Sequence, residues 1–275
     1  MVFVTKFDGR TQPFNKEKIV NTCLRIGINR QQAYEVANRI EREANNGITT
    51  KEILRRIFLY AKKYRPEIKD RKDLRSAIGA LRSKPDFEMF VALVLKEYGY
   101  EVQTNQIVSG KCVEHEIDVI AKKGNETILV EAKHHEQYHT YTGLSVFLEV
   151  QAELEDLMEG YKIRKNKINF TKALIVCNTK ISDHAERYAT CRDIGYISWK
   201  LPKEKNLEQV IEDGKLYPIT LLKGVDMITQ DRLIGKGIIL VKQLIEMNEN
   251  ELVKKTGIEK TKARDLVRKA KELLL

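Results

Sequence analysis

The sequence lacks the features that mark disulfide-stabilised, zinc-ribbon and membrane-spanning proteins. No apolar run approaches the roughly 20 residues that a bilayer-spanning helix needs. The N-terminal segment is charged and lacks the apolar core of a signal peptide. Its cysteines are scattered, and no pair has the C-x-x-C spacing of a zinc ribbon or a redox motif: Cys23, Cys112, Cys177 and Cys191. We therefore expect reduced thiols and a cytoplasmic protein.

Positive charge, in contrast, is in excess. The 275 residues allow two or three domains, and a hydrophobic content of 42% supplies enough apolar side chains for packed cores. Charged residues make up 32% of the chain, and the formal net charge is +10. Such a surplus favours a polyanionic partner, most simply nucleic acid. A lysine-rich surface that serves only solubility is the alternative.

Residues 1–83 have the pattern of a small helical domain that opens with a β-hairpin. Apolar and polar residues alternate on both sides of Asp8-Gly9, which is a hairpin signal. Three helical patterns follow, at residues 16–27, 30–44 and 50–64.

Residues 84–200 alternate helices and strands in the manner of one α/β domain. Apolar residues recur at helical spacing over 85–98, and Gly99 is the expected stop. The remaining elements are expected as strands at 100–108, 115–123 and 126–133, a helix at about 143–160, a strand at 172–179, a helix at 183–195 and a strand at 196–200. The predicted fold class is therefore multidomain α/β.

The rest of the chain is divided into a polar and a helical part. Residues 201–216 are polar and are expected to form a linker. Residues 217–275 return to short helical patterns, with an approximate internal repeat in which Gly-Ile precedes a helix. A small all-α C-terminal domain is expected there.

The central domain contains two acids and a lysine in a pattern suited to metal-dependent chemistry. Side chains alternate faces along a strand, so Glu131 and Lys133 point the same way. If the strands that carry Asp118 and Glu131 pair as a hairpin, the two carboxylates converge and repel each other. A divalent cation such as Mg²⁺ relieves that repulsion. Lys133 beside it can orient an attacking water or balance charge on a phosphate.

This arrangement resembles the PD-(D/E)xK nuclease superfamily, whose restriction-endonuclease-like fold has a mixed-sheet α/β core. Asp118 matches the aspartate of the motif, and Glu131-Ala132-Lys133 matches (D/E)-x-K. The segment "FEMFVALVLKEYGYEV" is similar to the first helix of the Mrr-type branch, in which an acid at the position of Glu88 joins the site. Gln151 stands where that branch often has a glutamine. The resemblance implies a catalytic set of Glu88, Asp118, Glu131, Lys133 and Gln151, with Mg²⁺ or Mn²⁺ held by Asp118, Glu131 and Glu88.

Each of these residues also has a plainer interpretation. Glu131 and Lys133 can form a surface ion pair on an edge strand. Glu88 can favour the dipole of its helix, and Gln151 can face solvent. The segment "KHHEQYH" places His135 four residues before His139, but it is expected in a loop, where a phosphate contact is favoured over a zinc site.

The N-terminal hairpin resembles the ATP-cone, a regulatory domain of ribonucleotide reductases and their repressor. The family opens with a Val-x-Lys-Arg-Asp-Gly hairpin, and Phe7 stands here in place of the usual arginine. A glycine turn flanked by cations and followed by a helix N-terminus can hold a triphosphate. The resemblance implies an ATP or dATP site formed by Val4, Lys6, Asp8, Gly9, Arg10 and Lys18. A small helical domain with an exposed basic hairpin is the alternative.

Residues 217–275 resemble tandem helix-hairpin-helix modules. Gly235-Lys236-Gly237 and Gly257-Ile258 are the candidate hairpins, because glycine lets backbone N–H groups approach a phosphate. A compact protein-interaction domain is the alternative. The side chains expected to contact DNA phosphates are Lys260, Lys262 and Arg264.

These segments together predict a Mg²⁺-dependent deoxyribonuclease with an ATP or dATP site that controls activity or assembly. The expected partners are DNA, nucleotide and further copies of the chain. One alternative is a non-catalytic, nucleotide-responsive DNA-binding protein, and another is an oligomerisation module for a second enzyme. The intact set of two acids and a lysine favours the enzyme.

Overall fold

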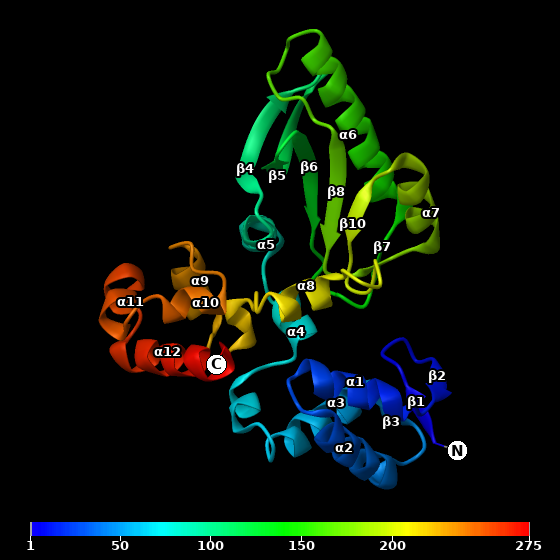
Figure 1. Cartoon of the computed structure of the whole chain (residues 1–275), viewed down its shortest axis with the longest axis vertical. Helices are drawn as coiled ribbons and strands as arrows, with labels where there is room; N and C mark the ends of the chain where they lie inside the picture. The colour runs from blue at the N-terminus through cyan, green and yellow to red at the C-terminus, as the bar shows by residue number, and fades with distance from the viewer. Residues whose placement is uncertain (1, 275) are drawn as a thin grey trace. The chain divides into compact units, whose positions relative to one another are not determined.

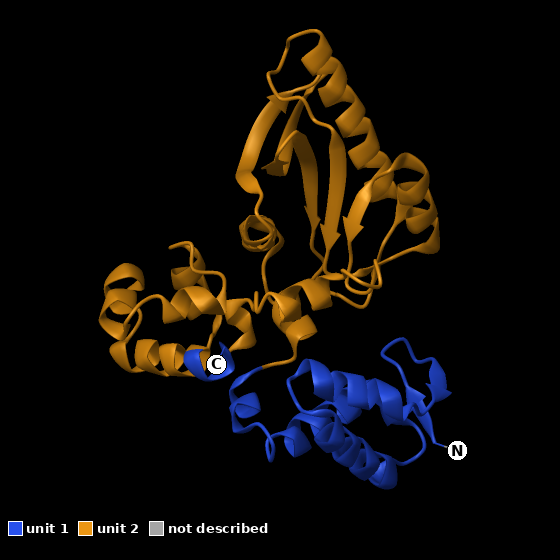
Figure 2. Cartoon of the chain, viewed as in Figure 1, with its two compact units in different colours: residues 1–71, 271–275 blue, residues 72–270 orange. Residues whose placement is uncertain are grey.

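The computed structural model of the chain describes residues 2–274 (Figure 1) and forms two compact units (Figure 2). One unit comprises residues 1–71 with 271–275, and the other comprises residues 72–270. Helical regions accompany a mixed sheet, so the multidomain α/β architecture is confirmed. Of the helices found between residues 2 and 274, none is long and apolar enough to cross a membrane.

The first unit combines three helices with a small sheet. Strand β1 (Phe3–Thr5) pairs with β2 (Thr11–Pro13) in an antiparallel hairpin, which confirms the predicted turn at Asp8-Gly9. Strand β3 (Ile48–Thr49) adds to β1 in parallel. The three predicted helices are confirmed, and a 3₁₀ turn follows them: α1 (Lys16–Arg25), α2 (Arg30–Glu43), α3 (Thr50–Ala61) and η1 (Pro66–Asp70).

Each helix of this unit begins at a polar cap and buries one apolar stripe. The N-caps Asn15, Asn29 and Thr49 each accept a hydrogen bond from the backbone N–H three residues on. Cys23 lies in the common core, where burial raises the pKa of its thiol to about 12. The core also includes Ile19, Val20, Ile28, Ala33, Val36, Ile40, Ile57 and Ile68.

The second unit contains a five-stranded mixed sheet in the order β10-β8-β6-β5-β4. Strands β4 (Glu101–Ser109), β5 (Glu114–Lys123) and β6 (Glu126–Lys133) form an antiparallel meander. Strands β8 (Lys172–Cys177) and β10 (Gly195–Ile197) extend it in parallel. All five strands were predicted from the sequence. A separate parallel pair is formed by β7 (Tyr141–Thr142) and β9 (Lys180–Ile181).

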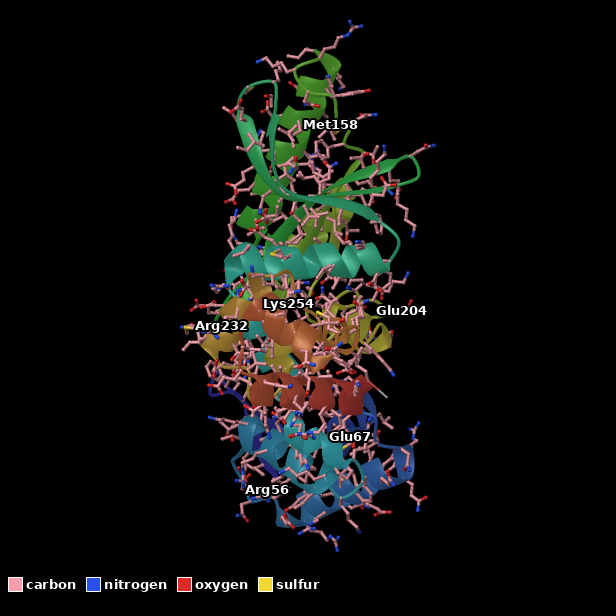
Figure 3. The ribbon with its side chains drawn as sticks, turned by 90° about the vertical axis from the view of Figure 1, so that its left-hand side faces the viewer. Arg56, Glu67, Met158, Glu204, Arg232 and Lys254 are labelled. Carbon is pink, nitrogen blue, oxygen red and sulfur yellow. The ribbon has the colours of Figure 1, made fainter. Side chains whose placement is uncertain are left out.

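Helices α6 (Leu144–Lys162) and α7 (Asp183–Arg192) cover one face of this sheet and share a core with it (Figure 1). Phe147 is fully buried in that core, and Met158, labelled in Figure 3, packs against it. Helix α5 (Glu88–Glu97) contacts β4 and β5. It therefore brings its first residue to the strands that carry the predicted acids.

The segment predicted as a polar linker, residues 201–216, contains a packed helix instead. Helix α8 (Leu207–Asp213) begins at a capping box formed by Asn206 and Gln209. The i, i+3, i+4 spacing of its apolar residues is a helix signal, which the many charged neighbours obscured. Its buried face is made by Leu207, Val210 and Ile211.

Within this unit, helix α4 (Leu74–Gly79) is packed against the C-terminal region. The Thr220 hydroxyl donates to the Ala77 carbonyl at 2.7 Å, and the Lys72 N–H donates to the Leu221 carbonyl at 2.7 Å. Ala77, Thr220 and Leu221 are all buried. The short elements of the C-terminal region are η3 (Ile219–Leu221), α9 (Met227–Ile234), α10 (Val241–Ile245), α11 (Glu249–Thr256) and α12 (Lys260–Leu274).

Candidate active site

The backbone pairing of strands β5 and β6 ends next to Asp118 and Glu131. Their backbone pairing ends at Val119↔Val130, and one further step would set Asp118 opposite Glu131. There, Asp118 Oδ2 accepts a hydrogen bond from the backbone N–H of Ala132, at 2.9 Å. The side chain of Asp118 thus takes the place of a backbone acceptor. This bond fixes its carboxylate beside the strand that carries Glu131.

Glu88 opens helix α5 and brings a second buried carboxylate to Asp118. It follows the π-helical turn η2 (Ser83–Phe87). Only 1% of the residue is exposed, and neither carboxylate oxygen accepts a hydrogen bond from the described part of the chain. Burial first, and then the charge of Asp118, raise the pKa of Glu88 to about 7. A buried carboxylate without a donor is costly unless a cation satisfies it.

Glu131 and Lys133 lie on one face of β6, the middle strand of the five. The interpretation as an ion pair on an edge strand therefore does not apply. Burial first, and then the charge of Asp118, raise the pKa of Glu131 to about 7, while the charge of Lys133 opposes the shift. The two side chains are thus held close together on a strand that is paired on both sides.

A lysine that the sequence analysis did not select lies among these carboxylates. Lys84 Nζ is 3.1 Å from Glu116 Oε1, 3.4 Å from Glu88 Oε1 and 3.4 Å from Asp118 Oδ1. Burial alone would lower the pKa of Lys84, but the three neighbouring carboxylates outweigh it and raise that pKa. In the described chain, no group of three or more His, Cys, Asp or Glu side chains is arranged as a metal site. The cation found among the acids is the lysine ammonium group.

Helix α6 brings Glu153 close to the acids, and the same helix carries the predicted Gln151. Gln151 Nε2 donates to Glu155 Oε1 at 2.6 Å, and its buried Oε1 accepts no hydrogen bond within residues 2–274. Glu153 is close enough to Glu131 for its charge to raise the pKa of Glu131. Burial raises the pKa of Glu153 itself. The sequence could not show whether Gln151 or Glu153 faces the acids, because both residues border the buried stripe of the helix.

His134, the residue after the Glu131-Ala132-Lys133 motif, joins the end of β6 to the turn η2. Its Nε2 is 3.1 Å from the Ile78 carbonyl oxygen, its Nδ1 is 3.4 Å from Ser83 Oγ, and its ring centroid is 5.1 Å from that of Phe87. A carbonyl can only accept, so Nε2 carries the proton. Burial lowers the pKa of His134, which favours the neutral ring. The neutral ring of His134 therefore links the end of β6 to α4 and η2.

The hairpin of the first unit carries four of the predicted nucleotide-binding residues. The Lys6 N–H donates to the Arg10 carbonyl at 2.8 Å and closes the turn, in which Gly9 has a φ of 79°. The Arg10 guanidinium pairs with Asp8, with Nη2 2.5 Å and Nε 2.7 Å from Oδ2. This pair lowers the pKa of Asp8. The cation at position 10 is thus already engaged by an acid of the same turn.

The two other predicted nucleotide-binding residues support the hairpin. Val4 is buried and anchors β1 in the unit. Lys18 Nζ donates to Gln12 Oε1 at 3.2 Å, which links α1 to β2. Phe7, at the position where the ATP-cone has arginine, is 77% exposed. The nucleotide site itself stays a prediction.

The cations predicted to bind DNA in the C-terminal region are paired with acids. Lys262 Nζ is 2.6 Å from Asp226 Oδ2, and Arg264 Nε is 2.7 Å from Glu249 Oε2. Arg232, labelled in Figure 3, donates instead to the Gly257 carbonyl at 2.6 Å. The helix-hairpin-helix assignment and its DNA contacts stay predictions.

Comparison with protein families divides the chain into three matched regions. Residues 2–78 match the ATP cone domain, residues 82–198 match a restriction endonuclease domain, and residues 217–274 match the AF1548-like C-terminal domain. The ATP cone match extends beyond the first compact unit, which ends at Arg71, into helix α4 of the second. Helix α4 therefore belongs to one domain by sequence and to the other by packing.

Similar proteins are known from Archaeoglobus fulgidus and from a solved structure. An uncharacterized protein of that organism is 34% identical over 184 residues, which are 67% of this chain and 99% of that protein. A second is 45% identical over 42 residues, or 15% of this chain and 89% of that protein. The crystal structure of a protein of unknown function, AF1548, is 35% identical, covers 67% of this chain and 94% of its own, and superposes with a TM-score of 0.59. The chain therefore belongs to the AF1548-like family and carries, in order, an ATP cone domain, a restriction endonuclease domain and an AF1548-like C-terminal domain.

Proposed function

We propose that the chain is a divalent-cation-dependent deoxyribonuclease that is regulated by ATP or dATP. The observation that carries this proposal is the buried carboxylate of Glu88, which accepts no hydrogen bond from residues 2–274 although Asp118 and Glu131 stand close by. Burial first, and then the charge of Asp118, raise the pKa values of Glu88 and Glu131. A site of this kind gains most from a cation with oxygen ligands.

The acids suit Mg²⁺ or Mn²⁺ because they offer hard oxygen donors on two strands and a helix. Asp118 and Glu131 would hold the cation, with Glu88 as a further ligand. When bound, a divalent cation polarises the phosphoryl group and supplies a hydroxide-like nucleophile. The hydrogen bond from Ala132 N–H orients Asp118 in advance, so little reorganisation is needed on binding.

The remaining residues would position water and balance charge. Lys133 shares the face of Glu131 and can orient the attacking water or stabilise the charge that develops on the phosphate. Gln151 Oε1, which has no hydrogen-bond donor among the described residues, can accept a hydrogen bond from a water molecule or from the substrate. Glu153 adds negative charge beside Glu131, which further favours a cation there.

The substrate and the regulatory ligand follow from charge and from the domains. A net charge of +10 favours a polyanion, and a restriction endonuclease domain favours DNA as that polyanion. The ATP cone domain favours ATP or dATP as the ligand of the first unit. Self-association into a homo-oligomer is part of the proposal, because a small regulatory domain can act by changing assembly.

The deciding experiment is cleavage of DNA with and without added Mg²⁺, with the substrate offered as duplex, branched and single-stranded forms. We expect cleavage that requires Mg²⁺ or Mn²⁺ and stops on addition of a chelator. Cleavage that persists in the chelator would contradict the proposed cation. Tight binding of DNA with no cleavage of any form would favour a non-catalytic DNA-binding protein.

A further inference from the structure

The acids of the proposed metal site already surround a positive charge, which is Lys84 of the same chain. Its Nζ lies within 3.4 Å of three carboxylates, those of Glu88, Glu116 and Asp118. We propose that Lys84 is an internal counter-cation, which occupies the metal site in the cation-free protein and must leave it before a divalent cation binds. This inference rests on the proposed function, because it assumes that the divalent cation binds at these acids.

The contacts of Glu88 make Lys84 its main source of stabilisation. The residue is 1% exposed, its carboxylate accepts no hydrogen bond from the described residues, and the Lys84 ammonium group lies 3.4 Å from its Oε1. Asp118 differs, because its second oxygen is held by the Ala132 N–H at 2.9 Å. Lys84 thus places its positive charge beside Glu88 and Asp118, two of the three acids that the proposed function assigns to the metal. An ammonium group and a divalent cation cannot share this space, so their binding is competitive.

The backbone beneath Lys84 is fixed, whereas its side chain is not. Asp86, which is fully buried, accepts hydrogen bonds from the backbone N–H of Arg82 at 3.2 Å and from its guanidinium at 2.8 Å. Gln230 of α9 donates to the same carboxylate at 2.9 Å. The Lys84 side chain, in contrast, is 57% exposed. Displacement of Lys84 therefore requires rotation of one flexible side chain into solvent and no rebuilding of the turn.

A displaced Lys84 would lie at the mouth of the site, where DNA must bring its phosphate. The phosphate would stabilise the outward position, and the outward position leaves the acids to the metal. By linkage, DNA binding then tightens metal binding and metal tightens DNA binding to the same extent. Lys84 would thus restrain metal binding until substrate is present.

The test is titration of the full chain with Mn²⁺ by calorimetry, in the wild type and in two variants. Lys84→Gln removes the competing charge, and Lys84→Arg keeps it. Two unit charges about 4 Å apart interact by about 1 kcal/mol in bulk water, which corresponds to a factor of about 5, so Lys84→Gln should bind Mn²⁺ roughly 5-fold more tightly. Lys84→Arg should bind close to wild-type affinity. Equal affinity of wild type and Lys84→Gln would overturn the inference.

A matched control is Lys172→Gln, which removes another half-exposed lysine that pairs with an acid, Glu126, at 2.6 Å. Lys172 is the first residue of β8 and pairs with Ile128 of β6, away from the end of β6 that carries Glu131 and Lys133, so Lys172→Gln should leave Mn²⁺ affinity unchanged. A similar gain in affinity in this control would show a general effect of net charge and would also overturn the inference.

A second measurement reports on Lys84 without any mutation. The rate of covalent modification of Lys84, followed by mass spectrometry, should rise when saturating Mn²⁺ is added, while that of Lys172 stays constant. Modification of Lys84 that is independent of bound Mn²⁺ would contradict displacement. If neither wild type nor Lys84→Gln binds Mn²⁺, the proposed metal site itself is refuted, which separates the two failures.

Discussion

Asp118 accepts from the backbone N–H of Ala132 the hydrogen bond that a neighbouring strand would otherwise take, at 2.9 Å. Ala132 stands between Glu131 and Lys133, so this one bond ties the aspartate to both other members of the motif. The arrangement makes the three side chains a unit that is fixed by backbone geometry. A change of Glu131 or Lys133 should therefore affect chemistry more than folding, whereas a change of Asp118 also removes this hydrogen bond.

We expect Glu131→Gln and Lys133→Ala each to abolish Mg²⁺-dependent DNA cleavage. The first removes a proposed metal ligand, and the second removes a positive charge near the reacting phosphate. Loss of one group that stabilises a transition state typically lowers the rate by about 100- to 1000-fold. Single-turnover cleavage under saturating enzyme measures the effect, and circular dichroism shows whether the fold is intact.

Glu126→Gln is a suitable control for this pair, since Glu126 lies on the same strand but pairs with Lys172 in the exposed region. It should cleave like the wild type. Full activity of either Glu131→Gln or Lys133→Ala would remove that residue from the catalytic set.

The raised pKa values of Glu88 and Glu131 predict a dependence of metal binding on pH. Both pKa values lie at about 7, above the ordinary value of 4.5, because the sites are buried and because Asp118 is near. A metal displaces the protons, so Mn²⁺ affinity should rise as the pH increases through about 7 and level off above it. Calorimetry in buffers of different ionisation enthalpy would count the protons released. Affinity that stays flat from pH 6 to about 8 would contradict these pKa shifts.

The raised pKa values of the buried glutamates also predict that the metal-free protein loses stability as the pH rises. A carboxyl whose pKa is raised in the folded state contributes stability that is complete below about 4.5 and is lost as pH rises through about 7. The melting temperature in chelator should therefore fall over this interval. Glu88→Gln should reduce the fall, because glutamine does not ionise. An equally steep fall in Glu88→Gln would show that other groups cause it.

Residues Gln230 and Asp231 of α9 offer a test of how the C-terminal region supports the site. Gln230 donates at 2.9 Å to the buried Asp86, whereas Asp231 forms an ion pair with Arg82 at 2.9 Å in which both partners are about half exposed. Hydrogen bonds to buried charged groups contribute about 1.5–3 kcal/mol, and exposed ion pairs contribute about 0–1 kcal/mol. Denaturant unfolding should therefore show a larger loss for Gln230→Ala than for Asp231→Ala. Equal losses would mean that the bond to Asp86 adds little.

Much of the fold followed from the sequence because its periodicities are strong. The spacing of apolar residues in α5 and the alternation in β6 set the faces of Glu88, Glu131 and Lys133. Lys84 could not be found in this way, because it precedes a proline in a turn that has neither period. Its neighbours Glu116 and Asp118 lie far from it in the sequence, so they could be identified only from the packing of η2 and α5 against β5.

The structure differs from the sequence-based predictions in two further places, and each difference has its own physical cause. In α6, Gln151 and Glu153 flank the same buried stripe, and only the rotation of the helix against the sheet decides which acid or amide faces Glu131. In the segment 201–216, charged residues concealed three apolar ones that form a buried helix face. The local composition thus predicted an exposed linker, whereas the packing of α8 against distant parts of the chain buries its apolar residues.

The last prediction concerns nucleotide binding to the first unit, where Arg10 is already paired with Asp8 at 2.5 Å. A triphosphate must compete with Asp8 for that guanidinium, and it gains bidentate contacts if it succeeds. We therefore expect Lys6→Ala combined with Arg10→Ala to abolish binding of ATP and dATP. Asp8→Asn should instead tighten it, because the competing charge is gone. Calorimetry of the full chain with ATP, dATP and ADP measures each effect.

Nucleotide binding is also expected to change assembly, which sedimentation of the full chain with and without nucleotide would show. If nucleotide favours an oligomer, oligomerisation must tighten nucleotide binding by the same factor, so affinity should rise with protein concentration. Helix α4 is the candidate route to the proposed active site, because the ATP cone match includes it and because Ile78, near its end, accepts the hydrogen bond of His134. Binding of nucleotide should then alter hydrogen exchange in residues 134–142 in wild type and leave it unaltered in the Lys6→Ala, Arg10→Ala variant. Unchanged exchange in wild type at saturating nucleotide would show that regulation, if it reaches the site, does not pass through α4.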